Sequence, residues 1–381
     1  MSILSLIIFI VAFSGMVIIH ELGHFLAARA CNIEVEEFGI GLPTPGALTL
    51  FTWKGTRFTF NWLPLGGFIR PKGENDPTIP GGLAAANPWK RLIVLFAGPL
   101  MNLIMAVILF SIVIAISGGI ITYTPESSGN SRVLITNVMA NSPAKEAGMQ
   151  MGDVLVSGAG QSIKTSDDIR NVVVDHVDKP VSFVVERQGK QIELMITPKF
   201  NEAEGRPLIG IEYCSGCAFV PITSVGANLQ TSLRYTGNQI YALVTLPVKL
   251  IRGTIAPDQG RMVGLKGIYD IMNQSVTNDV QASQQAAAAP STSSSASPYN
   301  KPVQTLLLIA TLSISLGVFN LFPIPALDGG RIIFVLPELI TRRRVPAQFE
   351  NIVHTLGMAV LLLLMIYINV MDFINPVVLP K

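Results

Sequence analysis

Residues 3–24 read ILSLIIFIVAFSGMVIIHELGH, an apolar run that leads directly into His20, Glu21 and His24. On a helix, residues four apart project from the same face, so His20 and His24 can bind one Zn²⁺ while Glu21 lies beside the reacting water. Ionisable side chains cost about 2.5 kcal/mol or more each at the centre of a bilayer. Their presence at the end of an apolar helix therefore indicates a metal site. The alternative is an exposed helix beside the membrane in which the motif is coincidental.

The composition of the whole chain indicates an integral membrane protein. Of 381 residues, 49% are hydrophobic and 14% are charged, about half the charged share of a soluble domain, and the mean hydropathy is +0.48. The formal net charge of +2 gives no reason to expect a nucleic-acid partner. The expected surroundings of the protein are therefore membrane lipid.

Four apolar stretches, residues 3–28, 92–118, 303–322 and 355–374, are long enough to cross a bilayer or nearly so. Basic residues gather between the first two stretches and again after the third, and the positive-inside rule assigns both of these loops to the cytoplasm. Both chain termini and the long segment 119–302 are then extracytoplasmic. The zinc motif is expected towards the cytoplasmic side of the membrane.

The loop after the first apolar stretch contains a predicted β-hairpin, residues 48–62. Two segments rich in β-branched and aromatic residues flank a turn at Lys54 and Gly55, and the motif PLGG follows at 64–67. An apolar hairpin beside a membrane site can dip into the bilayer and offer an unpaired edge to another strand. A hairpin that lies at the interface and only packs on the helices fits the sequence equally well.

The extracytoplasmic segment begins with a compact α+β domain, predicted at residues 131–200. A strand comes first, and Ser142 and Pro143 then start a short helix that Gly148 ends. The order of elements resembles a circularly permuted PDZ domain of the kind found in bacterial envelope proteases. That resemblance implies peptide binding by strand addition, and a purely structural spacer is the alternative.

The predicted fold class is a polytopic α-helical membrane protein with four transmembrane helices, a membrane-associated β-hairpin and an inserted α+β PDZ-like domain. Low apolar content predicts that the Ala/Gln/Ser/Pro tract is a disordered linker. The predicted segments are a zinc-motif helix at 1–30, a cytoplasmic loop with the hairpin at 31–89, a second transmembrane helix at 90–118, the PDZ-like domain at 131–200, an extracytoplasmic amphipathic helical region at 201–280, the linker at 281–300, a third transmembrane helix at 301–330, a cytoplasmic loop at 331–354 and a fourth transmembrane helix at 355–375.

The third apolar stretch ends in the sequence NLFPIPALDGGR at 320–331. Two prolines and two glycines cannot continue a regular helix, so the backbone must open where Asp328 is presented. Catalytic zinc takes three protein ligands and keeps one open position, which His20, His24 and Asp328 with one water satisfy. The alternative is that Asp328 only caps a helix that follows Gly330.

Four motifs together resemble the site-2 protease family of intramembrane zinc metalloproteases, and within it the bacterial regulator of sigma-E protease type. They are HELGH at 20–24, PLGG at 64–67, FAGPLMN at 96–102 and NxxPxPxLDG at 320–329. The resemblance implies a bacterial inner-membrane enzyme that cleaves single-pass membrane proteins, such as an anti-sigma factor or remnant signal peptides, after another protease has removed their external domain. It also implies that Asn320, Pro323 and Pro325 hold the substrate strand, whereas Asn102 matches an asparagine that knits helices together.

The chain departs from this family pattern in two places. It has one PDZ-like domain where regulator-type relatives often carry two, and residues 264–268 replace a region where relatives tend to have a Gly-Pro pair. Neither departure touches the predicted chemistry, in which one Zn²⁺ per chain activates water and Glu21 moves its proton to the leaving amine. The competing hypothesis is a non-catalytic zinc-containing membrane scaffold that recruits partners through its PDZ-like domain.

Four further residues carry weaker indications. His176 is expected to be a solvated polar residue and His354 an interfacial one. Cys214 and Cys217 are extracytoplasmic in the predicted topology, so a disulfide between them is conceivable.

Overall fold

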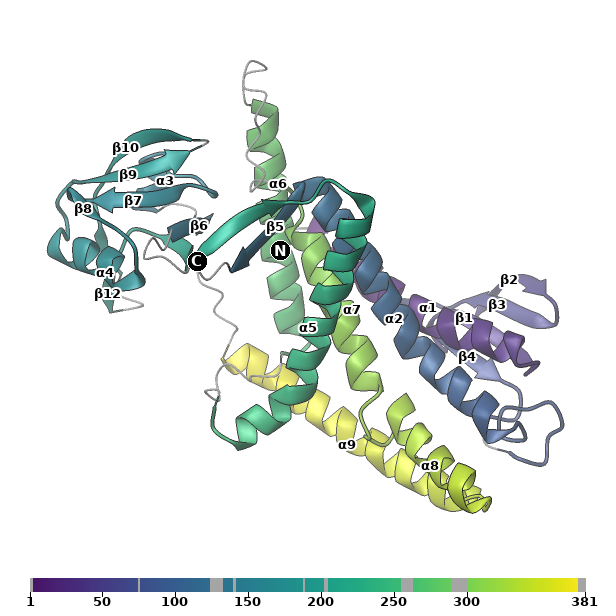
Figure 1. Ribbon diagram of the computed structural model, residues 1–381. Coiled ribbons are helices and arrows are strands. Elements are labelled where there is room, and N and C mark those ends of the chain that lie inside the picture. The colour runs from purple at the N-terminus through teal and green to yellow at the C-terminus, as the bar shows by residue number, and fades with distance from the viewer. Residues whose placement is uncertain are drawn as a thin grey trace. The chain divides into compact units, whose positions relative to one another are not determined.

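The computed structural model describes residues 3–74, 76–123, 133–139, 142–187, 189–201, 205–254, 263–288 and 301–375. The chain divides into two compact units, each formed by segments that are distant in sequence (Figure 1). Unit 1 comprises Met1–Ile112, Leu229–Thr277 and Gln304–Val377, and unit 2 comprises Val113–Asn228, Asn278–Val303 and Val378–Lys381. All predicted metal ligands belong to unit 1, so the candidate site lies within one compact unit.

Unit 1 is built on apolar helices. Three of the described helices are long and apolar enough to cross a membrane, namely α1 (Ile3–Ala30), α2 (Pro88–Ser117) and α9 (Ala347–Ile374). The third predicted span is α7 (Gln304–Asn320), an apolar helix of 17 residues. At 1.5 Å per residue it measures about 25 Å, less than the roughly 30 Å of a hydrocarbon core. Four full-length spans are therefore not confirmed, because the third helix already ends at Asn320.

A further helix, α5 (Val225–Ile251), packs beside α2 and α7 (Figure 1). Ser111 Oγ of α2 donates to Ser232 Oγ of α5 at 3.0 Å. The helix continues through Pro247 to Ile251.

The helix α6 (Leu265–Ala288) packs against α1 through its first half, where the rings of Tyr269 and Phe9 meet edge to face with centroids 5.7 Å apart. It includes residues 281–288, which the sequence assigned to a disordered linker. Ala and Gln favour helix, and a helix that is already anchored extends at little cost per residue. The rest of the predicted linker, 289–300, lies outside the described residues.

A four-stranded sheet connects α1 to α2. Its strand order is β2-β3-β1-β4, formed by β1 (Val35–Leu42), β2 (Leu48–Trp53), β3 (Thr56–Phe60) and β4 (Leu63–Pro71). β2 and β3 pair antiparallel around Lys54 and Gly55, whose φ values of 47° and 85° suit a tight hairpin turn. β3 then pairs in parallel with β1, so the predicted hairpin is part of a larger sheet. The membrane association of the hairpin stays a prediction.

One face of this sheet covers α1. The ring of Phe25 on that helix lies 5.7 Å, centroid to centroid, from the rings of both Phe38 and Phe58. β4 pairs with β1 on one side and is the last strand of the described sheet on the other. An edge strand is thereby held against the helix that carries the zinc motif.

Unit 2 contains the PDZ-like domain. Its sheet has the order β10-β9-β7-β6-β13, with β8 paired to β7, and its strands are β6 (Val133–Val138), β7 (Val154–Gly158), β8 (Gln161–Ser162), β9 (Val181–Arg187), β10 (Lys190–Ile196) and β13 (Ile211–Ser215). Two helices, α3 (Pro143–Glu146) and α4 (Ser166–Asp175), complete it. The side chains of Ile135 and Phe183 are fully buried in one core.

The PDZ-like sheet extends beyond the predicted end at residue 200. β13 pairs antiparallel with β6. The start of the region 201–280, which was predicted to be helical, instead contains strands, which are β11 (Lys199–Asn201), β12 (Arg206–Leu208), β13 and β14 (Cys217–Pro221). β14 pairs with β5 (Gly119–Tyr123), which places Tyr123 opposite Cys217. The chain therefore leaves for the domain and returns from it at adjacent positions. A disulfide joins Cys214 to Cys217 at this return.

Helix α8 (Asp328–Thr341) begins at the predicted third ligand. The backbone is open over 321–327, whereas Gly329 and Gly330, which were expected to interrupt a helix, lie in the first turn of α8. Most of the predicted loop 331–354 is helical, because it has apolar partners: Ile332 is buried in a cluster with Leu92 of α2. The non-helical residues 321–327 thus connect the two helices α7 and α8.

Candidate metal centre

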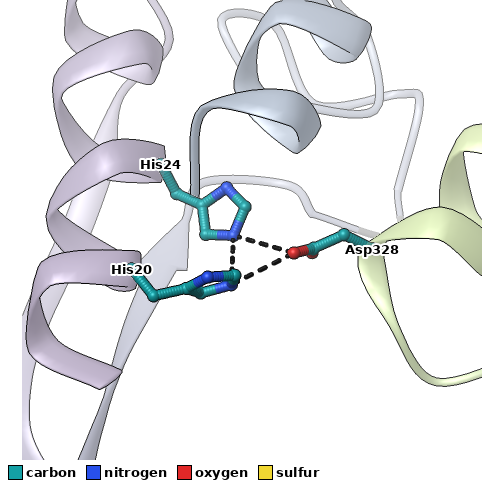
Figure 2. Close-up of side chains that lie close together, drawn as sticks. All are labelled: His20, His24 and Asp328. Carbon is teal, nitrogen blue, oxygen red and sulfur yellow. Dashed lines mark hydrogen bonds and ion pairs between the residues drawn. The ribbon is translucent and has the colours of Figure 1, made fainter. Parts of the chain in front are cut away.

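His20 and His24 lie one turn apart on α1, and both are buried. Their ring centroids are 4.7 Å apart in an edge-to-face arrangement, and their Nε2 atoms are 3.1 Å apart (Figure 2). The spacing of four residues causes this convergence, since it exceeds one helical turn by less than half a residue. The helix alone thus supplies two of the three predicted ligands.

Asp328, the first residue of α8, brings a carboxylate to the two rings. Its Oδ2 lies 3.1 Å from His20 Nε2 and 3.2 Å from His24 Nε2 (Figure 2). Ligand atoms at about 2.0–2.1 Å from a tetrahedral zinc ion are about 3.3 Å apart. The three donor atoms therefore match three corners of a zinc site. The N-cap of α8 is Leu327, so Asp328 faces the histidines and is not the N-cap residue.

Helix α2 contacts the ring of His24 on the side of Nδ1, away from the proposed metal position. The Nδ1–H of His24 donates to Val94 O at 2.7 Å, which keeps the proton on Nδ1 and the lone pair of Nε2 available for a metal. Gly98 lies against the same ring: a Cβ at this position would lie 2.6 Å from His24 Cε1. On α1, a Cβ at Gly23 would meet the backbone of Ala97. The two glycines permit the close approach of the two helices.

The opened chain between α7 and α8 is held by α9. Ala326 has a φ of 76°, and its backbone N–H donates to His354 Nδ1 at 2.9 Å. A Cβ at Gly330 would lie 2.9 Å from the carbonyl carbon of Ile324, so the turn folds tightly onto the start of α8. His354, interpreted from sequence as interfacial, therefore supports the loop that presents Asp328.

Glu21 lies beside the histidines on α1, and its carboxylate turns towards the sheet. Its Oε2 accepts a hydrogen bond from the backbone N–H of Ile69 on β4 at 3.1 Å. A backbone donor of this kind has no recognisable signature in a sequence. The carboxylate is thus oriented between the metal centre and the edge strand.

The predicted substrate residues lie where the chain opens after α7. Asn320 Nδ2 donates to Leu316 O of its own helix at 3.0 Å, Pro323 is exposed and Pro325 is half-buried. Their contact with a substrate stays a prediction. His176 belongs to unit 2, where its Nδ1 bonds to the carbonyl of the residue one turn earlier on α4.

A His-Glu-x-x-His helix, a carboxylate that completes its ligand set and a bundle of apolar helices define a membrane-embedded metalloprotease. The predicted metal ligands meet at one point, and the scaffold hypothesis gives no reason for a glutamate oriented beside them. The chain belongs to peptidase family M50, whose family model matches residues 8–364. It is therefore a metalloprotease and an integral membrane protein.

Relatives with curated names agree with this assignment. A protein of Campylobacter jejuni that carries the name of a zinc metalloprotease is 32% identical, over 95% of this chain and 91% of that protein. A similarly named protein of Clostridium perfringens is 32% identical, over 97% of this chain and 98% of its own length. Metalloprotease MmpA of Caulobacter vibrioides is 29% identical, with 93% and 91% covered.

Solved structures similar to part of the chain include PDZ domains of SdrC-like proteins. That of Listeria monocytogenes covers 23% of this chain and 93% of its own, with 20% identity and a TM-score of 0.21. That of Listeria innocua covers 22% and 92%, with 27% identity and a TM-score of 0.20.

Proposed function

We propose that this chain is an intramembrane zinc endopeptidase of the site-2 type, which holds one Zn²⁺ through His20, His24 and Asp328. The observation that carries the proposal is the separation of 3.1–3.2 Å among three donor atoms from two helices that are distant in sequence. The apolar character of α1 supports hydrolysis at a site within the membrane.

Each residue of the centre has a separate part in the reaction. When bound, Zn²⁺ would supply Lewis acidity, which would polarise the scissile carbonyl and lower the pKa of water so that it can lose a proton near neutral pH. Glu21 takes the proton of the attacking water and delivers it to the leaving amine. The N–H of Ile69 orients the Glu21 carboxylate before substrate arrives, which reduces the reorganisation needed for proton transfer.

The proposed substrates are transmembrane segments of single-pass proteins. A transmembrane helix has its amides satisfied, so it must unwind locally before a carbonyl can reach the centre. The edge strand β4 supports a route, because a substrate strand that pairs with β4 passes Ile69 and therefore Glu21. Asn320, Pro323 and Pro325 are proposed to hold the other side of the unwound strand.

We assign the protein to the bacterial inner membrane, with the active site towards the cytoplasm and both termini and the PDZ-like domain outside. The basic residues that support this topology include Lys54, Arg57, Arg70 and Lys72, which lie between the first two apolar helices. The exposed side chains of Leu48, Phe51 and Trp53 support the membrane association of the hairpin, because a soluble surface rarely carries so many neighbouring apolar groups.

Glu21→Gln tests the proposal, because glutamine keeps the shape of the side chain and cannot accept the proton. The purified variant should retain zinc and cleave a model transmembrane substrate about 10²–10⁴-fold more slowly. Glu36→Gln, at an exposed position of β1, is the matched control and should retain both properties. Unchanged turnover in Glu21→Gln would remove Glu21 as the base. A parent enzyme that stays active after complete removal of zinc would overturn the metal centre.

A further inference from the structure

The ring of His20 meets a polar side chain that is not a metal ligand. Asn102 of α2 is fully buried, and its Nδ2 lies 3.2 Å from His20 Nδ1. The oxygen of the same amide, Oδ1, is buried and has no hydrogen-bond partner among the residues that the structure describes. Buried amide oxygens are normally paired, so the orientation of this amide needs an explanation.

The chemistry of a zinc-binding histidine decides which atom of that amide should face the ring. A neutral imidazole carries one proton, and Nε2 of His20 can bind a metal only when this proton is on Nδ1. The Nδ1–H group then needs an acceptor, which an amide nitrogen cannot provide. The two ends of an asparagine amide have nearly the same shape, so a half-turn of the Asn102 amide brings Oδ1 to that place.

Given the proposed zinc site, on which this role depends, we infer that Asn102 is a positioning residue of the metal centre. Its Oδ1 accepts the Nδ1–H of His20 and thereby selects the tautomer that presents Nε2 to zinc. The same bond fixes the plane of the ring, since a buried imidazole with a held outer nitrogen cannot rotate about χ2.

The place of Asn102 on α2 supports this role. The other histidine ligand is held in the same way, with His24 Nδ1 bonded to Val94 O at 2.7 Å. Val94, Gly98 and Asn102 follow one another at intervals of four residues, so they share one face of α2. That face contacts both histidine rings at their outer nitrogens, and Gly98 between the two contacts leaves room for the ring of His24.

A role for Asn102 in joining helices does not depend on its amide. Its backbone oxygen accepts a hydrogen bond from Ser313 Oγ of α7 at 2.8 Å. Any residue at this position keeps that link between α2 and α7. The amide can therefore be replaced without removing this link, and a change in zinc affinity then reports on the side chain.

Two substitutions of similar size separate the two orientations of the amide. Asn102→Asp keeps an acceptor for Nδ1–H and loses the donor, whereas Asn102→Leu loses both. Competition with a chromophoric chelator, on purified full-length protein in detergent, should give a zinc affinity about 10–100-fold lower for Asn102→Leu. We expect Asn102→Asp to stay close to the parent. Asn369→Leu is the control, because that side chain bonds Met365 O of its own helix and its loss should leave zinc affinity unchanged.

The visible absorption of the Co²⁺-loaded protein provides a second readout, because it reports the ligand set and not the fold. Asn102→Asp should reproduce the parent spectrum. Zinc binding by Asn102→Asp that is tenfold or more weaker than the parent would overturn the inference, since it would mean that Nδ2 donates to His20. Parent-like affinity in Asn102→Leu would also overturn it. If Asn102→Leu does not fold, Asn102→Ala replaces it, because alanine also lacks both the donor and the acceptor.

A failure of the proposed function looks different from a failure of this role. If the parent protein binds no zinc, the metal centre itself is wrong and the role of Asn102 falls with it. If the parent binds zinc and Asn102→Leu keeps parent-like affinity, the protease assignment stands and Asn102 is a packing residue.

Discussion

One added methyl group at Gly98 should disable the metal centre. In Gly98→Ala the Cβ would lie 2.6 Å from His24 Cε1 and 2.8 Å from Cδ2, whereas ordinary contacts begin at 3.4 Å. The ring of His24 must then retreat by at least about 0.8 Å, the difference between 2.6 Å and 3.4 Å. It has little freedom to do so, because its Nδ1 is bonded to Val94 O and the residue is only 7% exposed.

This displacement sets the size of the effect. A hydrogen bond of 2.7 Å between His24 Nδ1 and Val94 O that lengthens by that amount reaches the limit of hydrogen bonding. Loss of the outer partner of a metal-binding histidine costs about 10–100-fold in metal affinity, and an extra methyl group in a packed crossing costs about 1–3 kcal/mol of stability. We expect zinc affinity and cleavage to fall at least about tenfold.

The assay compares parent and Gly98→Ala by zinc titration against a chelator and by cleavage of a model transmembrane substrate. Gly15→Ala is the matched control on α1, where the described residues, apart from the helix backbone and the two chain neighbours, place no atom within 4 Å of the added Cβ. It should keep zinc and activity, since alanine favours helix over glycine. If Gly98→Ala binds zinc and cleaves like the parent, the contact between α2 and the His24 ring is not as close as described.

Three further outcomes follow from the structure. Asp328→Ala should lower zinc affinity at least about tenfold because a charged ligand is lost, whereas Asp167→Ala, at an exposed position of α4, should not. Equal zinc affinities of the two variants would refute Asp328 as the third ligand. Asp372→Leu removes the acceptor of two backbone amides near the start of α6, so thermal unfolding should show a loss of about 1–3 kcal/mol that Asn369→Leu does not. Replacing 124–216 by a short turn between β5 and β14 should preserve cleavage of a substrate whose external domain has been removed, and should raise cleavage of a substrate that keeps this domain. Loss of cleavage of the shortened substrate would favour peptide capture by the PDZ-like domain.

Much of the candidate metal centre could be predicted because two of its three proposed ligands are close in sequence. The distance between His20 and His24 depends only on the geometry of one helix, and the apolar residues before them predict that helix. Asp328 was a harder prediction, since it comes from a segment about three hundred residues later. Two prolines and a family motif indicated it, and the structure brings its Oδ2 to within 3.2 Å of both rings.

Element boundaries were predicted less well wherever a distant partner decides them. β13 belongs to the PDZ-like sheet because it pairs with β6, a strand from the other end of the domain. The parallel pairing of β3 with β1 turns an expected hairpin into a four-stranded sheet. Residues 331–341 are helical because Ile332 finds buried partners on α2. Hydropathy and turn residues predict the secondary structure of a segment, but they do not predict which other segment will pack against it or pair with it.

The hydrogen-bond partners of the candidate metal centre could be identified only from the tertiary structure. Every residue carries a carbonyl and nearly every residue an amide, so nothing in the sequence distinguishes Val94 O or the N–H of Ile69 as partners of His24 and Glu21. The hold of His354 on the loop before Asp328 likewise depends on how α9 packs. Apolar length and helical spacing are properties of neighbouring residues, which the sequence contains in full. The hydrogen bonds that orient His24 and Glu21 come from other elements, so they depend on the tertiary fold, which local periodicity does not encode.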